Sequence, residues 1–141
     1  MKVILDKYQL HIIIERLAYQ LIENYTDLST VVIIGIQPRG VYLSDKIVEQ
    51  LKKISPGNQI RYGKMDITFY RDDIRQELHK PKQTDITFSV EDKNVILVDD
   101  VLFTGRTIRA GLDALLDFGR PKKVELCVLV NRRYSRQLPI Q

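Results

Sequence analysis

The sequence predicts an α/β fold in which a mainly parallel central sheet is flanked by helices. Short runs of β-branched and apolar residues alternate along the chain with segments whose apolar residues recur at helical spacing. Two of these runs, residues 31–36 and 95–98, are apolar on both faces, as strands buried in a parallel sheet are. The chain has 141 residues, which is the length of one domain, so we expect a single domain over residues 1–141.

The first part of the chain predicts a helix, a buried strand and a second helix. Asp6 is a suitable N-cap for the first helix, which carries apolar residues at helical spacing. The strand 31–36 follows, and the turn-forming residues 37–40 break it. A second helical pattern covers residues 43–54 and stops at a Ser-Pro-Gly-Asn turn.

The middle of the chain is less regular. Residues 60–70 alternate in part between apolar and polar side chains, which indicates a strand. The polar stretch 71–85 has no core-facing pattern, and a loop of that length is typical of a lid over a site or of a disordered segment. Residues 86–90 predict a short strand.

The last part of the chain predicts a strand, a helix and a final strand. The apolar run 95–98 ends in two acidic residues, and a Thr/Gly-rich loop follows it. The apolar residues of the next helix lie at helical spacing, and Gly119 and Pro121 close that helix. Residues 124–130 form the last predicted strand.

Three loops follow predicted strands at the carboxyl edge of the sheet, where such sheets bind their ligands. They are residues 37–40, 99–107 and 131–134. In the second loop, Asp99 and Asp100 are followed by two Thr hydroxyls and the start of a helix, which together suit a phosphate. The two carboxylates suit sugar hydroxyls or a hydrated Mg²⁺ ion. The combination predicts a phosphorylated sugar as the ligand.

Composition and charge exclude several classes of protein. With 44% apolar and 28% charged residues the chain is not a disordered one, and no apolar run approaches the ~20 residues of a membrane span. The single cysteine, Cys127, cannot form an internal disulfide, so we expect a cytoplasmic protein. The net charge is +4, and residues 120–141 carry six Lys and Arg against one acidic residue, which is compatible with an anionic partner.

The stretch 95–107 resembles the phosphoribosyl-diphosphate motif of the type I phosphoribosyltransferases. Its wording, VDDVLFTGRT followed by IRAGLDAL, is most similar to the PyrR-like branch, the bifunctional pyrimidine-operon regulators with uracil phosphoribosyltransferase activity. The segments IGIQPRG at 34–40, DITFYRDD at 66–73 and LPI at 138–140 are similar as well, so the resemblance covers nearly the whole chain. It implies the type I phosphoribosyltransferase fold with a flexible loop at about 71–85, no membrane association, and a homo-oligomer.

The resemblance implies a role for each residue of these motifs. Asp99 and Asp100 would hold the ribose hydroxyls of 5-phosphoribosyl 1-diphosphate and, indirectly, a Mg²⁺ ion; with Arg39 they would be the catalytic residues. Arg71 in the flexible loop and Arg132 after the last strand would contact the substrate. The other residues implied to bind the substrate are Gln37, Pro38, Gly40, Val101, Leu102, Phe103, Thr104, Gly105, Arg106 and Thr107.

Phe103 bears on the acceptor base. Relatives that act on 6-oxopurines carry an Asp at the matching position, where it handles the proton of the base, whereas this chain has an aromatic residue, as the pyrimidine branch does. The resemblance therefore implies transfer to uracil, giving UMP and pyrophosphate. Two alternatives stay open: a nucleotide-sensing regulator of pyrimidine genes that binds RNA, and a phosphoribosyltransferase for another base.

Three departures from the family's pattern concern the acceptor site and the partner. Pro38 stands where the regulators usually have Thr, and it removes a backbone donor from the pyrophosphate loop. Residues 131–134 read Asn-Arg-Arg-Tyr where the regulators have Asp-Arg-Gly-His. The chain ends at Gln141, where the family continues with a segment that helps cover the acceptor base, so we expect that cover to be missing or shortened.

Overall fold

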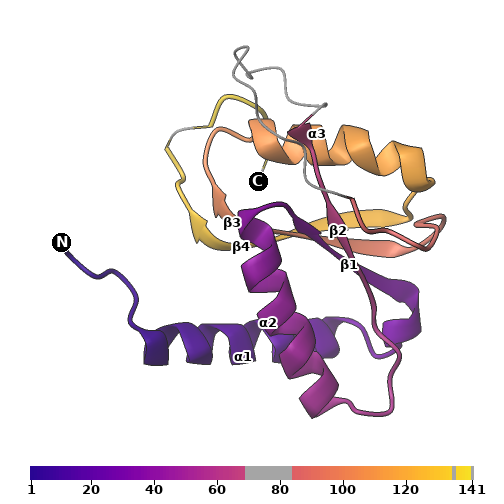
Figure 1. Ribbon diagram of the computed structural model, residues 1–141, viewed down its shortest axis with the longest axis horizontal. Helices are drawn as coiled ribbons and strands as arrows, with labels where there is room; N and C mark the ends of the chain where they lie inside the picture. The colour runs from indigo at the N-terminus through magenta and orange to yellow at the C-terminus, as the bar shows by residue number, and fades with distance from the viewer. Residues whose placement is uncertain (69–83, 135, 141) are drawn as a thin grey trace.

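The computed structural model describes residues 1–68, 84–134 and 136–140, and this part of the chain confirms the predicted α/β class. Its four strands form a parallel sheet in the order β2-β1-β3-β4, with helices on both faces (Figure 1). The strands are β1 (Val31–Ile36), β2 (Arg61–Met65), β3 (Asn94–Leu102) and β4 (Lys123–Asn131). The helices are α1 (Lys7–Asn24), α2 (Arg39–Ile54) and α3 (Arg106–Leu115), with short 3-10 turns at Leu28–Thr30 and Leu116–Phe118.

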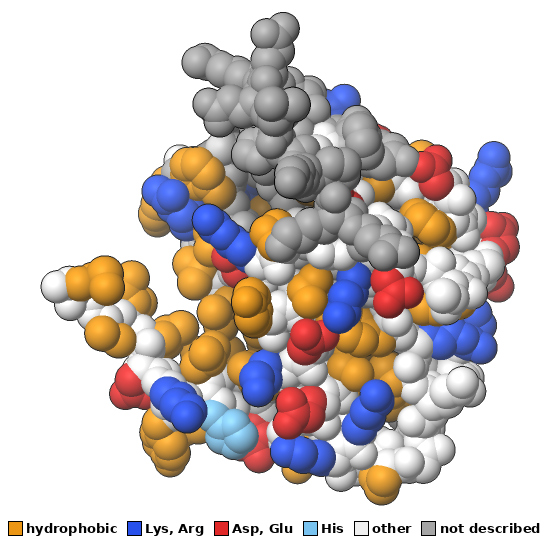
Figure 2. Space-filling model, viewed as in Figure 1, with side chains coloured by type: hydrophobic (Ala, Val, Ile, Leu, Met, Phe, Trp, Pro, Cys, Tyr) orange, Lys and Arg blue, Asp and Glu red, His pale blue; other side chains and the backbone are white. Residues whose placement is uncertain are grey.

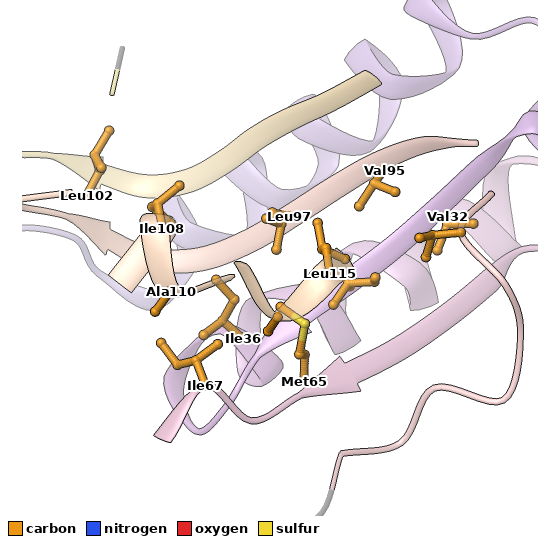
Figure 3. Packing of buried hydrophobic residues seen from close by; sticks show 13 residues of the cluster. Val32, Ile36, Met65, Ile67, Val95, Leu97, Leu102, Ile108, Ala110 and Leu115 are labelled. Atoms are coloured by element: carbon orange, nitrogen blue, oxygen red, sulfur yellow. The ribbon is translucent and has the colours of Figure 1, made fainter. Parts of the chain in front are cut away.

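The core lies in two layers, one on each face of the sheet. Ile33 and Ile96 belong to the layer that α1 and α2 cover. Val32 and Leu97 belong to the layer that α3 covers, which is drawn in Figure 3. Successive residues of a strand thus enter opposite layers. β1 is buried along its whole length, as its run of residues that are apolar on both faces predicts. No helix of the described residues is long and apolar enough to cross a membrane.

The N-terminus of α1 is fixed by the predicted cap. Gln9 N–H donates a 2.8 Å hydrogen bond to Asp6 Oδ1, and Asp6 N–H donates a 3.0 Å bond to Gln9 Oε1, a pairing that contributes about 1 kcal/mol. On the outer surface of α1 and α2, acidic and basic side chains are interspersed (Figure 2). Glu49 of α2, for example, pairs with Lys46 and Lys53. The basic surplus of the sequence therefore does not gather on this face.

The strand expected at residues 60–70 is shorter in the structure. β2 ends at Met65, because Asp66 Oδ1 accepts hydrogen bonds of 2.9 and 2.6 Å from the N–H and the hydroxyl of Thr68 and so forms a turn. Residues 71–83, most of the predicted loop, lie outside the described residues.

The short strand expected at residues 86–90 does not form. Asp85 makes an isolated antiparallel bridge with Lys64 of β2, and the pairing stops there. The N–H of Val90 donates instead to the carbonyl of Phe118, at 3.0 Å, in the turn after α3. The apolar side chains of this segment face the core, but its backbone hydrogen bonds go to a turn rather than to a neighbouring strand.

β3 is longer than predicted and contains both acidic residues of the motif. Its apolar run stops before the acidic pair, yet its backbone continues to pair with β4 as far as Leu102, which lies opposite Asn131. Asp99 and Asp100 are therefore part of the strand and not of the loop after it. Similarly, residues 39–40, expected in a loop, form the first turn of α2.

Candidate functional site

Two adjacent carboxylates lie at the carboxyl end of β3. Asp99 is 7% exposed and Asp100 is half-buried, and the two carboxyl groups lie close enough for the charge of Asp100 to act on Asp99. The N–H of Asp100 donates a 2.9 Å hydrogen bond to Asp99 Oδ1, and the N–H of Val101 donates a 2.8 Å bond to Asp100 Oδ1. Each carboxylate is thus held by the backbone amide that follows it, and both have oxygens left for a ligand.

The buried carboxylate has a perturbed affinity for protons. Burial raises the pKa of Asp99 from its ordinary value of 3.8 to about 7. The hydrogen bond from Asp100 N–H and the positive charge of Arg39 oppose this rise, whereas the negative charge of Asp100 adds to it. A carboxyl group with such a pKa changes its charge near neutral pH, and a cation bound beside it would favour the ionised form.

The shifted pKa of Asp99 predicts how stability depends on pH. An acid whose pKa is higher in the folded than in the unfolded protein stabilises the fold at low pH, and this contribution is lost as pH rises through the folded pKa. Without added metal, the free energy of unfolding of the wild type, relative to that of Asp99→Asn, should fall between about pH 4 and pH 7, by up to about 4 kcal/mol. Chemical denaturation of both proteins across this range measures the difference; a difference independent of pH would contradict the assigned burial.

The first turn of α2 lies directly against the end of β3. A Cβ atom at Gly40 would be 2.3 Å from the carbonyl oxygen of Val98 and 3.0 Å from the Cα of Asp99, so only glycine permits this approach. The approach brings Arg39 close enough for its charge to lower the pKa of Asp99. Immediately before this turn, the Gln37–Pro38 peptide bond is cis, and Gln37 N–H donates to Met65 O at the end of β2. Residues 37–40 therefore border the acidic pair.

A loop and a helix N-terminus follow the acidic pair. Gly105 adopts a left-handed conformation, with φ of +92°, and α3 begins at the next residue without a side-chain cap. The first N–H groups of a helix lack intrahelical partners, so this end of α3 is suited to bind an anion. The loop surrounds a cavity of about 450 Å³. The cavity is lined by Val101, Leu102, Phe103, Thr104, Gly105, Arg106, Thr107, Ile108 and Gln137.

The segment after β4 packs on this loop, a feature that sequence reasoning missed. Thr104 O accepts hydrogen bonds of 2.8 and 3.0 Å from the N–H groups of Gln137 and Leu138. Gly105 lies under the same segment, since a Cβ there would be 3.1 Å from the side chain of Ile140 and 3.3 Å from that of Leu138. Arg106 Nε also donates a 2.7 Å bond to Gln137 Oε1. The signal in the sequence is two apolar residues, Leu138 and Ile140, that close an otherwise basic segment.

Phe103 and Arg132 form a stacked pair beside the cavity. The Arg132 guanidinium lies 4.1 Å from the centre of the Phe103 ring, and Phe103 is 42% exposed. Arg132 N–H donates to Leu102 O at 2.9 Å, which holds the end of β4 against the loop.

The predicted site residues that the structure describes gather at one edge of the sheet. Arg39 and Gly40 lie beside the acidic pair, residues 101–107 span the end of β3, the loop 103–105 and the start of α3, and Arg132 stacks on Phe103 of that loop. Arg71 lies outside the described residues. No cluster of three or more His, Cys, Asp or Glu side chains forms among the residues that the structure describes. The acidic pair offers carboxylate oxygens, the kind of group beside which Mg²⁺ binds while it keeps part of its water.

The chain is similar to known proteins in its domain family, in its sequence relatives and in its fold. Residues 2–141 match the phosphoribosyl transferase domain. A protein named bifunctional protein PyrR from Desulfosudis oleivorans is 50% identical over 98% of this chain and 77% of its own length. The protein of the same name from Bacillus subtilis is 43% identical over 99% of this chain and 78% of its own length.

Solved structures of similar fold are more distant in sequence. A hypoxanthine-guanine phosphoribosyltransferase from Bacillus anthracis superposes with a TM-score of 0.77 at 18% identity, over 100% of this chain and 79% of its own. A hypoxanthine phosphoribosyltransferase from Staphylococcus aureus has a TM-score of 0.75 at 20% identity, over 99% of this chain and 73% of its own. These likenesses bear on the fold alone.

Proposed function

The chain belongs to the phosphoribosyltransferase family, in the branch of the bifunctional PyrR proteins, and from this premise we propose its reaction. The protein transfers the phosphoribosyl group of 5-phosphoribosyl 1-diphosphate to uracil, giving UMP and pyrophosphate, with Mg²⁺ as cofactor. The observation that carries this proposal is the placement of a carboxylate pair and an anion-binding helix N-terminus on consecutive segments of one sheet edge.

Each end of the donor substrate meets groups of matching chemistry. The 5′-phosphate binds the N–H groups at the start of α3 and the hydroxyls of Thr104 and Thr107. The ribose hydroxyls donate hydrogen bonds to Asp99 and Asp100, whose carboxylates are already oriented by the backbone amides of Asp100 and Val101. The pyrophosphate lies over the first turn of α2, where Arg39 supplies a positive charge.

Mg²⁺ fits this arrangement because two adjacent carboxylates, one of them buried, place negative charge and oxygen atoms where a hydrated ion can bind. When bound, the ion would neutralise the negative charge of the pyrophosphate leaving group. Asp99 and Asp100 are the residues that would hold it, indirectly, through the ligand that they bind.

The chain's own groups act on the transition state for transfer. Cleavage at the sugar C1 passes through a state with positive charge on the ring, by analogy with glycoside chemistry. Asp100 stabilises that charge through the ribose hydroxyls, and Arg39 stabilises the negative charge on the departing pyrophosphate. Arg71, in the loop expected over the site, is proposed to add a further positive charge there.

Uracil is the acceptor that suits the residues around the reacting carbon. Within residues 99–107 the only carboxylates are the two proposed to hold the ribose, and Phe103 supplies an apolar ring instead of a base. Uracil has an acidic N1, so its deprotonation needs less assistance than that of a purine. The Phe103–Arg132 pair provides a flat surface at the position where a planar base would enter.

RNA binding is the second candidate function. The relatives in this branch carry the name bifunctional, and Arg132 and Arg133 are exposed after β4 in the basic end segment. Lys and Arg side chains of this kind bind the phosphates of RNA, with an affinity that falls as the salt concentration rises.

We further propose a single catalytic domain over residues 1–141, active as a homo-oligomer in the cytoplasm.

Nucleotide formation from 5-phosphoribosyl 1-diphosphate and Mg²⁺ with uracil, hypoxanthine, guanine or orotate in turn tests the proposed reaction. We expect UMP from uracil. Phe103 cannot act as a general base, so the proton of a purine would have no acceptor at this position, and we expect the purines to react at least about 100-fold more slowly. Turnover of hypoxanthine or guanine without turnover of uracil would refute the acceptor. No turnover at all, with tight and salt-sensitive RNA binding, would favour the regulator.

A further inference from the structure

Arg136 belongs to the segment 136–140, which packs on residues 103–105, the loop proposed to bind the 5′-phosphate and called the phosphate loop below. Its guanidinium donates four hydrogen bonds, and their acceptors come from three separate segments. Nη1 donates to Phe103 O at 2.5 Å and more weakly to Arg132 O at 3.4 Å. Nη2 donates to Asn131 Oδ1 at 2.6 Å, and Nε donates to Ile140 O at 2.9 Å. One side chain thus joins the phosphate loop, the end of β4 and the end of the described chain.

We infer that Arg136 is a positioning residue for the loop proposed to bind the 5′-phosphate, an inference that rests on the proposed function. The geometry follows from the guanidinium itself, which is planar and presents its N–H donors in a fixed fork. Acceptors that bind the Nε edge and the Nη edge of one guanidinium are therefore held in fixed positions relative to each other. The carbonyl of Phe103 lies one residue before Thr104, so fixing it fixes the start of the phosphate loop.

The rest of the loop depends on the segment that Arg136 anchors. Gln137 and Leu138, the two residues after Arg136, donate their N–H groups to Thr104 O. Ile140, whose carbonyl accepts from Arg136, contacts the face of Gly105 where a Cβ would be. If Arg136 no longer held this segment, the loop would lose both its hydrogen bonds and its packing on that side.

The acceptors of Arg136 are all uncharged, so its hydrogen bonds differ from those of a salt bridge. Three are backbone carbonyls and one is the amide oxygen of Asn131, and no carboxylate pairs with Arg136 among the described residues. Hydrogen bonds from a charged donor to such acceptors are each worth about 1.5–3 kcal/mol. Arg136 is also half-buried, whereas Arg120, which precedes β4, is exposed and its side chain makes no contact of this kind in the described structure. Arg120 therefore offers a matched control for loss of one positive charge.

The test measures binding of two ligands that occupy different ends of the proposed site. Ribose 5-phosphate contains the group that the loop would bind, whereas inorganic pyrophosphate with Mg²⁺ would bind at the first turn of α2. For Arg136→Gln we expect the affinity for ribose 5-phosphate to fall about 10- to 100-fold, the equivalent of one or two charge-assisted hydrogen bonds. The affinity for pyrophosphate should stay within about twofold, which also shows that the fold is retained. Arg120→Gln should leave both affinities within about twofold.

Arg136→Lys separates geometry from charge. A lysine keeps the positive charge but cannot span acceptors on both edges of a guanidinium, so we expect it to bind ribose 5-phosphate as weakly as Arg136→Gln does. Faster hydrogen exchange of the backbone amides of residues 103–108 in Arg136→Lys, with β1 unchanged, should accompany the loss.

Three results would overturn the inference. They are equal affinities of Arg136→Gln and Arg120→Gln for ribose 5-phosphate, full rescue by Arg136→Lys, and an equal loss of affinity for both ligands. A wild-type protein that fails to bind ribose 5-phosphate at all would overturn the proposed function, and this inference with it. Failure of the variants alone to differ leaves the proposed function intact.

Discussion

Replacing Asp100 with asparagine should lower kcat/KM for nucleotide formation by about 10³-fold. The substitution keeps the size of the side chain and can keep the hydrogen bond that Val101 N–H donates to it. It removes the negative charge that we place beside the ribose, so the positive charge that develops on the ring loses its main partner. It also removes one of the two carboxylates proposed to hold Mg²⁺. Initial rates of UMP formation over a range of 5-phosphoribosyl 1-diphosphate concentrations, from well below to above KM, give kcat/KM and measure the effect.

A matched control for this prediction is Asp113→Asn. Asp113 is exposed on α3, away from the acidic pair, so the same chemical change there should alter kcat/KM by less than about twofold. Asp100→Asn with activity within tenfold of the wild type would refute the assignment of the carboxylate pair to the ribose. The thermal stability of both variants should stay near that of the wild type, since neither aspartate is fully buried.

Replacing Gly40 with alanine should destabilise the protein by about 3 kcal/mol and remove its activity. The new Cβ would lie 2.3 Å from the carbonyl oxygen of Val98, and a backbone atom in the centre of a parallel sheet cannot move aside as a flexible side chain can. The first turn of α2 would have to move away from β3. Arg39 would then leave the acidic pair, and the groups proposed to bind pyrophosphate and ribose would separate.

Gly57→Ala is the control for the Gly40 substitution. A Cβ at Gly57 would meet no atom within 4 Å, so this variant should have the stability and activity of the wild type within measurement error. Denaturant unfolding and UMP formation give the two readouts. If Gly40→Ala is as stable and as active as Gly57→Ala, the close approach of α2 to β3 is not required for the site.

Local signals in the sequence are sufficient to predict most of the fold. The cap at Asp6 and the run Val31–Ile36 predict α1 and β1 because short-range hydrogen bonds and continuous burial determine both. The strand expected at 86–90 is wrong because apolar alternation reports which side chains are buried and not which backbone groups pair. The predicted end of β3 after residue 98 is wrong for the same reason, since Asp99 interrupts the apolar pattern while its backbone still pairs with β4.

The acidic pair and the phosphate loop follow from residues 95–107, because one contiguous motif contains them. The contacts between Arg136 and Phe103 and between Leu138 and Thr104 could not be predicted, since they join segments about 33 residues apart through backbone groups that every sequence provides. The close approach of Gly40 to Val98 could not be predicted either, because a glycine after Arg39 is equally typical of an ordinary turn.

The position of UMP in a crystal structure of the protein tests the central claim most directly. We predict that the phosphate of UMP lies within hydrogen-bond distance of the N–H groups of residues 105–107, with the ribose hydroxyls directed to Asp99 and Asp100 and the uracil ring beside Phe103. A nucleotide bound with its phosphate on Arg132 and Arg133, outside the loop, and its ribose away from the acidic pair would contradict the account.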